Sequence, residues 1–222
     1  MGLISRALLI LAPRRRVRAA FTRHYERRDW QEPETVSGRG SSLHRTAAIR
    51  RELPALVTEF GVRSVVDAGC GDFHWFATLE VDLESYLGID VVEEMVAANR
   101  TCYGTPRRQF ASLDIIRDPL PRADLILCRD CLVHLKNRQI SAALRNFRRS
   151  GSRYLLATTF TGDHPNEDAP LGGWRPLNLE RGPFSLGPPL RLINERDSVE
   201  DPRYPDKSLG LWALQPSRPT AT

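Results

Sequence analysis

The strongest constraint on this chain is a regular alternation of segments that begins at residue 64. From there, short runs rich in β-branched and apolar residues alternate with segments of helical character. Helices between buried strands are typical of a mostly parallel sheet with helices on both faces. The connection between residues 195 and 209 holds mainly acidic, polar and proline residues, too little for a crossover helix, so the final strand is expected to run antiparallel. The expected strands are residues 64–68, 86–90, 109–114, 124–128, 154–160, 191–195 and 209–214.

The predicted fold class is therefore α/β: a three-layer sandwich around a mostly parallel, seven-stranded sheet with an antiparallel last strand. Between the earlier strands we expect helices at about residues 73–79, 92–101 and 137–149. A further helix is expected before the sheet, over residues 43–60, with Ser41 or Ser42 as its N-cap and Gly61 as its stop. Pro54 is expected to kink this helix or to start a second one.

A glycine-rich turn, "VVDAGCGDF" at residues 65–73, follows the first expected strand. Turns in this position lie at the carboxyl edge of the sheet, where open α/β folds bind ligands. The dinucleotide-binding pattern G-x-G-x-x-G would need a third glycine where this chain has His74. Two carboxylates, Asp67 and Asp72, flank the turn, and each would repel a phosphate about 4 Å away by roughly 1–4 kcal/mol. The turn therefore suits a ligand with an ammonium group and no phosphate.

The segment Asp67-Ala68-Gly69-Cys70-Gly71 resembles the glycine-rich motif of class I S-adenosylmethionine-dependent methyltransferases, whose fold is Rossmann-like. The resemblance extends over residues 43–214 and implies S-adenosylmethionine as cofactor. It implies that Asp67 and Asp72 face the amino-acid end of the cofactor, and that Asp90 accepts from both ribose hydroxyls. It further places Asp114 at the adenine amino group, Leu113 against the ring and the backbone of Arg129 along the cofactor. The cofactor residues implied are Asp67, Ala68, Gly69, Gly71, Asp90, Val91, Leu113, Asp114 and Arg129.

Two other kinds of protein share part of this pattern. A short glycine motif occurs by chance, and an acid at the end of a strand often only caps a helix. A dinucleotide-binding oxidoreductase and a non-catalytic Rossmann-like module therefore remain alternatives to a methyltransferase.

Candidate catalytic residues follow the fourth expected strand. Methyl transfer from a sulfonium mainly requires alignment and exclusion of water, and a general base is needed only for a protonated nucleophile. Asp130 and His134 are the candidates, although capping or surface hydrogen bonding would also explain them. No metal is required. Cys128 and Cys131 form a C-x-x-C pair without the second pair that a structural zinc site needs, so ordinary thiols are expected.

Two loops are expected to determine specificity. The Gly/Ser turn at residues 37–42 could close over the cofactor's carboxylate or a substrate phosphate, assisted by Arg39 and Arg45, or could be a linker that ends in a helix cap. The long connection at residues 161–189 is expected to line a substrate pocket, or otherwise to be a structural flap. Its candidate substrate-binding residues are His164, Trp174, Arg175 and Asn178.

The N-terminal arm carries the excess positive charge of the chain. Residues 1–63 contain 13 Arg and 6 acidic residues, a net +7, whereas the remainder has 19 Lys and Arg against 21 Asp and Glu, a net −2. Residues 1–20 are compatible with peripheral contact to an anionic membrane, with a mitochondrial transit peptide, or with an amphipathic helix packed on its own domain. The expected organisation is a basic arm and Gly/Ser loop at 1–42, a methyltransferase domain at 43–215 and a disordered tail at 216–222.

The sequence favours a small-molecule methyl acceptor. An RNA or protein methyltransferase is the first alternative, motivated by the basic arm, and an inert cofactor-binding or interaction module is the second. The segment "CRDC" stands where enzymes of the family that methylate amide or base nitrogens carry N-P-P-Y, which favours an oxygen or amine acceptor. Four cysteines and no secretory signal indicate the cytoplasm. The sequence does not determine an oligomeric state.

Overall fold

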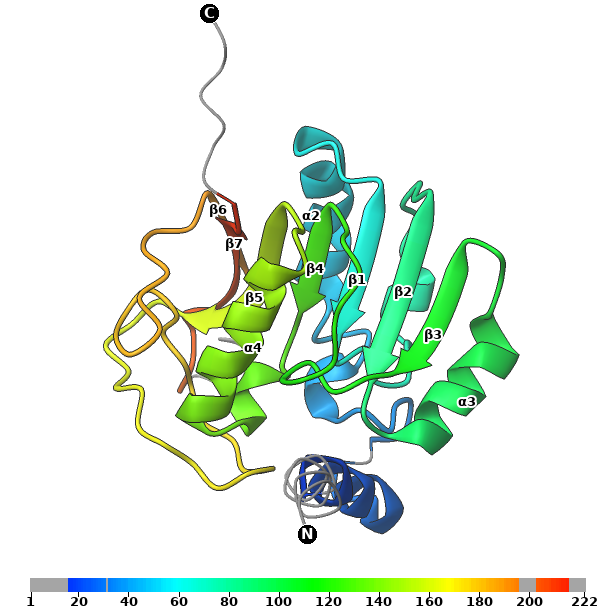
Figure 1. Ribbon diagram of the computed structural model, residues 1–222, viewed down its shortest axis with the longest axis horizontal. Helices are drawn as coiled ribbons and strands as arrows, with labels where there is room; N and C mark the ends of the chain where they lie inside the picture. Colours follow the sequence, from blue (N-terminus) through cyan, green and yellow to red (C-terminus); the bar gives the residue numbers. More distant parts are fainter. Residues whose placement is uncertain (1–15, 31, 196–202, 216–222) are drawn as a thin grey trace, which may run out of the picture.

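The computed structural model describes residues 16–30, 32–195 and 203–215, and its centre is one seven-stranded sheet (Figure 1). The strand order is β3-β2-β1-β4-β5-β7-β6. All neighbouring pairs from β3 to β5 are parallel, and β7 is antiparallel to both β5 and β6. This architecture confirms the predicted fold class. The strands are β1 (Ser64–Ala68), β2 (Ser85–Asp90), β3 (Arg108–Ser112), β4 (Leu125–Cys128), β5 (Tyr154–Phe160), β6 (Arg191–Asn194) and β7 (Lys207–Ala213).

Two apolar cores lie against the sheet because neighbouring side chains of a strand point to opposite faces. Val66 belongs to one core together with α4 (Asn137–Arg149), whereas Val65 belongs to the other together with α2 (Ala47–Glu59) and α3 (Glu93–Tyr103). The strands therefore read as continuous apolar runs, and the structure is a three-layer sandwich.

The expected helix at residues 73–79 is wrong. The chain forms turns there, with only a short 3₁₀ helix, η2, at Phe76–Thr78. Phe73 has a φ of 61°, which an α-helix does not allow, and its buried ring packs against Phe76 and Tyr86. Tertiary packing of this aromatic cluster outweighs the local helical pattern.

The helix before the sheet starts later than expected and does not break. α2 begins at Ala47, with Thr46 rather than a serine at its N-cap, and it continues through Pro54. The missing N–H of Pro54 costs one hydrogen bond, and the buried face on both sides of it keeps the helix whole. Gly61, with a φ of 57°, ends the helix as expected, because the N–H of Val62 bonds to the carbonyl of Val57.

A helix over residues 16–27 lies across the carboxyl ends of the parallel strands (Figure 1). Val17 is almost fully buried and joins the core that contains α4. For these residues, the packed amphipathic helix is the alternative that the structure supports. Residues 1–15, which hold most of the expected membrane-contacting segment, and the tail at 216–222 lie outside the described residues. Within the described ranges, no helix has both the length and the apolar character needed to span a bilayer.

Candidate active site

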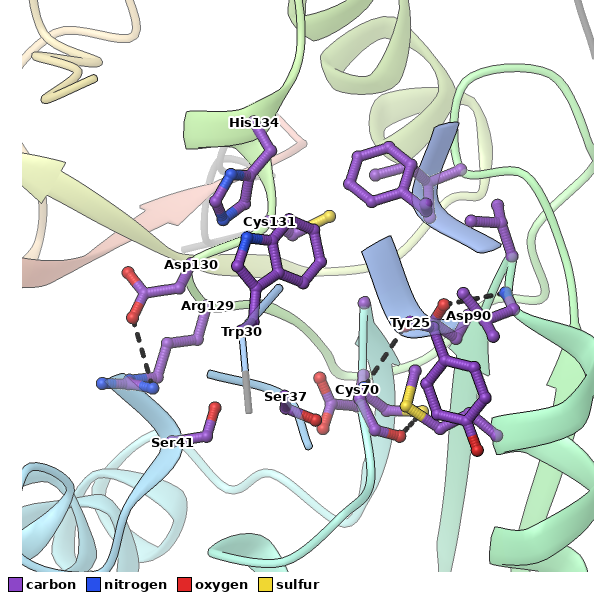
Figure 2. Close-up of a pocket in the computed structure, with 18 of the residues that line it drawn as sticks. Tyr25, Trp30, Ser37, Ser41, Cys70, Asp90, Arg129, Asp130, Cys131 and His134 are labelled. Atoms are coloured by element: carbon purple, nitrogen blue, oxygen red, sulfur yellow. Dashed lines mark hydrogen bonds and ion pairs between the residues drawn. The ribbon is translucent and has the colours of Figure 1, made fainter. Parts of the chain in front are cut away.

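A pocket opens at the carboxyl edge of the sheet, between the glycine turn and the N-terminal helix (Figure 2). Its space between atoms is about 1040 Å³, part of it open to solvent. The β1, β2 and β4 strands all end at this pocket, which explains why residues far apart in sequence meet here. The lining residues are Val17, Phe21, Tyr25, Trp30, Val36, Ser37, Ser41, Asp67, Gly69, Cys70, Gly71, Trp75, Asp90, Val91, Val92, Met95, Leu113, Asp114, Ile115, Ile116, Arg129, Asp130, Cys131, His134 and Leu135.

The glycine turn has the left-handed backbone that its sequence implied. Gly69 has a φ of 89° and Gly71 a φ of 57°, conformations that residues with a Cβ rarely adopt. A Cβ at Gly69 would lie 2.8 Å from Cys131 Sγ, and one at Gly71 would overlap Ser37 Oγ. Both glycines are therefore required by φ and by close packing. Ala68, expected among the cofactor residues, is fully buried in the core and does not line the pocket.

Asp67 lies at the base of the pocket as a buried carboxylate. Its Oδ2 accepts a hydrogen bond of 2.7 Å from the hydroxyl of Tyr86. Burial raises the pKa of Asp67 to about 7, the Tyr86 hydrogen bond opposes this shift, and the nearby charge of Asp90 adds to it. A carboxylate with so high a pKa gains strongly from a positively charged partner.

Asp90 stands at the end of β2 and is the second buried carboxylate of the pocket. Its Oδ1 accepts from the N–H of Val92 at 3.0 Å and its Oδ2 from the N–H of Gly71 at 3.3 Å. Burial raises the pKa of Asp90, whereas these backbone hydrogen bonds lower it. The two bonds orient the carboxylate without neutralising its charge.

The other acid of the turn, Asp72, does not face the pocket. Its carboxylate accepts hydrogen bonds from Thr35 Oγ1 at 2.7 Å, Val36 N at 2.8 Å and Ser37 Oγ at 2.9 Å. The expectation that Asp72 meets the cofactor is therefore wrong. Asp72 instead fastens the segment after the N-terminal helix to the glycine turn.

The far end of the pocket is apolar and contains the residues after β3. Leu113 lines it together with Met95 and Ile115. The Asp114 carboxylate also lies there, but it already accepts from Ile116 N and from Arg117 Nη1, both at 2.9 Å. β3 ends at Ser112 rather than at residue 114 because Asp114 caps this turn.

Arg129 and Asp130 belong to a buried network of charges beside the pocket. Lys207 Nζ lies 2.8 Å from Asp130 Oδ2 and 3.0 Å from Glu195 Oε2, and Arg129 lies 3.3 Å and 2.7 Å from the same two oxygens. Arg129 also donates to the Gly40 carbonyl at 2.8 Å. Burial raises the pKa of Asp130, but Lys207 and Arg129 outweigh it and hold the pKa well below its usual range. Asp130 is therefore a weak proton acceptor.

His134, the other catalytic candidate, has a defined proton arrangement. Its Nδ1 lies 2.8 Å from the Gly173 carbonyl oxygen, which can only accept, so Nδ1 carries the proton. Burial lowers the pKa of His134, while the bond to Gly173 opposes the shift. The ring is therefore neutral near pH 7, with an unprotonated Nε2.

None of the four residues expected to bind substrate lines the pocket. Arg175 is buried and donates to the Val133 carbonyl and to Asn137 Oδ1, both at 2.8 Å. Asn178 accepts from Glu180 N with its side chain and donates to the Gly162 carbonyl. His164 pairs with Asp206 at 3.0 Å, and Trp174 is 44% exposed. In the structure, Arg175 and Asn178 brace the loop at residues 161–189.

The N-terminal segment contributes pocket residues that the sequence reasoning missed. Val17, Phe21 and Tyr25 are spaced four apart, so one face of the helix points into the pocket, and Trp30 follows them. The four-residue spacing was a readable signal, but nothing local in the sequence shows which surface such a helix covers.

The two cysteines of the C-x-x-C pair lie at the end of β4. Cys128 is fully buried, and a hydrogen bond with Cys131 together with burial raises its pKa well above the usual value. Within the described ranges, no group of three or more His, Cys, Asp or Glu side chains is placed to hold a metal ion.

Comparisons with known proteins agree with this fold. Residues 65–151 match a family described as "Methyltransferase domain". No curated protein sequence matches the chain. The methyltransferase domain of bacterial CtHen1 superimposes with a TM-score of 0.56 at 14% identity, over 76% of this chain and 98% of that one. Human N-acetylserotonin methyltransferase in complex with S-adenosylmethionine gives 0.54 at 12%, over 76% and 52%.

A third similar structure, the [4+2]-cyclase SpnF, gives a TM-score of 0.53 at 16% identity, over 74% of this chain and 80% of that one. At these identities, the similarity concerns the fold alone, and this chain spans about half the length of the N-acetylserotonin methyltransferase. The match over residues 65–151, which covers less than half of the chain, and the strand order agree with the resemblance to class I S-adenosylmethionine-dependent methyltransferases that the glycine turn and the acids after it indicated.

Proposed function

We propose that the protein transfers a methyl group from S-adenosylmethionine to an oxygen or nitrogen of a small molecule. The observation that carries this proposal is the pair of buried carboxylates, Asp67 and Asp90, in one pocket under a left-handed glycine turn. Among the described residues, Asp67 is hydrogen-bonded by Tyr86 and Asp90 by backbone N–H groups, and neither forms an ion pair. Such a pocket favours a ligand with an ammonium group and hydroxyls and disfavours a phosphate.

The ligand's groups can be assigned to residues by their chemistry. Asp67 would hold the ammonium group, because its raised pKa falls when a cation binds. Asp90 would accept from the two ribose hydroxyls, since its oxygens are fixed by backbone bonds. Met95, Leu113 and Ile115 would enclose the adenine. When bound, S-adenosylmethionine supplies an activated methyl carbon, and the protein's part is to orient the acceptor and exclude water.

The N-terminal segment beside the pocket favours a small acceptor. Val17, Phe21, Tyr25 and Trp30 of this segment line the pocket, which narrows the space that a polymer could use beside the glycine turn. A nucleic-acid or protein acceptor is the second candidate, because Arg16, Arg23 and Arg27 are exposed on the helix at 16–27. An RNA substrate would bind less tightly by orders of magnitude as salt is raised from 50 to 200 mM, whereas a small neutral acceptor would not. A cytoplasmic location also stays a prediction.

Calorimetric titration with S-adenosylhomocysteine tests the proposal. We expect micromolar binding to the wild type, loss of at least tenfold in affinity for Asp90→Asn, and no binding of NADH. Glu59→Gln is the matched control, because Glu59 is an exposed acid at the end of α2, on the opposite edge of the sheet. No binding to a folded wild type would contradict the proposal. Binding without turnover of any acceptor would favour an inert cofactor-binding module.

A further inference from the structure

The part of the pocket around His134, Trp30 and Asp130, called here the acceptor end, differs from the rest in its aromatic lining. Figure 2 shows His134, Trp30 and Asp130 around one part of the pocket, with Cys70 and Asp90 toward the other. The ring centroids of Trp30 and His134 are 5.0 Å apart, and Phe21 meets His134 edge-on at 6.5 Å. This end is therefore walled mainly by aromatic rings.

Among the described lining residues, Asp130 is the carboxylate at this end of the pocket, and it is already held by two cations. Lys207 and Arg129 lie 2.8 Å and 3.3 Å from its Oδ2. A second ammonium group, brought by an amine acceptor, would meet this paired carboxylate and gain little from it. The charge balance thus favours an uncharged acceptor over a cationic one.

A glycine turn in the loop at residues 161–189 holds His134 in place. The N–H of Gly172 donates to the His134 carbonyl at 2.9 Å, and the Gly173 carbonyl accepts from His134 Nδ1 at 2.8 Å. Gly172 has a φ of 83°, and a Cβ there would collide with His24. Arg175 Nη1 donates a hydrogen bond to the carbonyl of the preceding residue, Val133, at 2.8 Å. The loop therefore fixes both the orientation and the tautomer of the ring.

The fixed tautomer leaves Nε2 of His134 as a proton acceptor on the pocket side. The described residues offer Nε2 no hydrogen-bond partner, whereas Nδ1 is occupied by Gly173. A buried, neutral imidazole with one nitrogen anchored on a carbonyl is poised to take a proton from a substrate. A nucleophile that arrives protonated needs such a group.

We infer that the methyl acceptor is the hydroxyl oxygen of a small aromatic ring, a phenol, which packs against Trp30 and gives its proton to Nε2 of His134. This inference rests on the proposed function and specifies its substrate class. The acceptor oxygen forms a bond to the methyl carbon, the bond from that carbon to sulfur breaks with its electron pair left on sulfur, and the phenol proton moves to Nε2. The protonated imidazole then releases this proton to solvent.

The test compares the wild type, His134→Gln and the matched control His44→Gln, an exposed histidine outside the pocket. Each is first titrated with S-adenosylhomocysteine. All three proteins should bind S-adenosylhomocysteine equally. This step tests the proposed function by itself, because a failure to bind would concern the cofactor site and not the acceptor. Each protein is then given labelled S-adenosylmethionine with phenol, catechol, 2-naphthol, 4-nitrophenol, an aliphatic amine and a carboxylic acid.

We expect methylation of at least one phenol and of neither the amine nor the acid. In His134→Gln, kcat/KM for an ordinary phenol should fall about a hundredfold or more, the usual contribution of a general base. The loss should shrink to a few-fold for 4-nitrophenol, whose hydroxyl is already ionised near neutral pH. Without the base, the rate should also rise with pH up to the pKa of the phenol.

A binding measurement gives a second readout that does not depend on turnover. With S-adenosylhomocysteine bound, the wild type should bind phenol several-fold more tightly than toluene, because the phenol hydroxyl donates a hydrogen bond to Nε2 of His134. His134→Phe should lose this preference, and His44→Gln should keep it. The inference is overturned if the protein binds S-adenosylhomocysteine but none of the phenols is bound or methylated, if an amine or acid is preferred, or if His134→Gln methylates every phenol at the wild-type rate.

Discussion

Ser37 and Asp72 form a reciprocal pair of hydrogen bonds between the N-terminal segment and the glycine turn. Ser37 Oγ donates to Asp72 Oδ1 at 2.9 Å, and the Asp72 N–H donates to Ser37 Oγ at 2.7 Å. The same serine lies where a Cβ on Gly71 would be. These bonds tie the segment at residues 35–37 to the glycine turn on the other side of the pocket. They also explain why the Asp72 carboxylate does not face the pocket.

Replacing Asp72 with Ala should loosen the segment at residues 35–37 from the glycine turn. Thr35, Val36 and Ser37 would lose their shared acceptor, which should cost about 1–3 kcal/mol of stability. We expect faster proteolysis within residues 28–42 and a higher dissociation rate of S-adenosylhomocysteine. Limited proteolysis and stopped-flow binding would measure these changes. Asp82→Ala, which removes an exposed acid, is the control. Equal proteolysis of Asp72→Ala and wild type would contradict the role of the pair.

Gly71 and Gly61 allow strain and steric overlap to be separated. Both have a φ of 57°, but nothing lies within 4 Å of a Cβ at Gly61, whereas Ser37 occupies that place at Gly71. Gly61→Ala should therefore cost only the backbone strain, about 1–2 kcal/mol. Gly71→Ala should cost more and should also weaken binding of S-adenosylhomocysteine. Denaturant unfolding and calorimetry would measure both, and Ser37→Gly should partly rescue Gly71→Ala. Equal costs at the two glycines would refute the overlap.

Asp67 predicts the pH dependence of cofactor binding. Its pKa in the free protein is raised to about 7, so below pH 7 the carboxyl is protonated and must lose a proton before it can pair with an ammonium group. Affinity for S-adenosylhomocysteine should therefore fall by up to about tenfold per pH unit below 7 and level off above it. Calorimetry from pH 5.5 to 8.5 would measure this. Asp67→Asn should bind weakly with a much flatter profile around pH 7. A flat wild-type profile would mean that Asp67 does not contact the amino group.

Local sequence determined the sheet and the ligand edge. The strands could be predicted because each is a short apolar run that is visible in the local sequence. The antiparallel direction of the last strand could be predicted because the segment before it is too short and too polar to form a crossover helix. Gly69 and Gly71 were readable because only glycine adopts their φ angles easily, and Asp67 and Asp90 because carboxyl ends of parallel strands share one edge.

Tertiary structure decided which side chains meet. Asp67 and Asp72 are both acids beside one turn, and local sequence does not distinguish them. Asp72 points away from the pocket because the fold places Ser37, 35 residues away in sequence, next to it. Likewise, Lys207 neutralises Asp130 across 77 residues, and Gly173 sets the tautomer of His134 across 39. Nothing in the local sequence of one partner indicates the other. The partners meet only because the packed layers of the fold bring distant loops together.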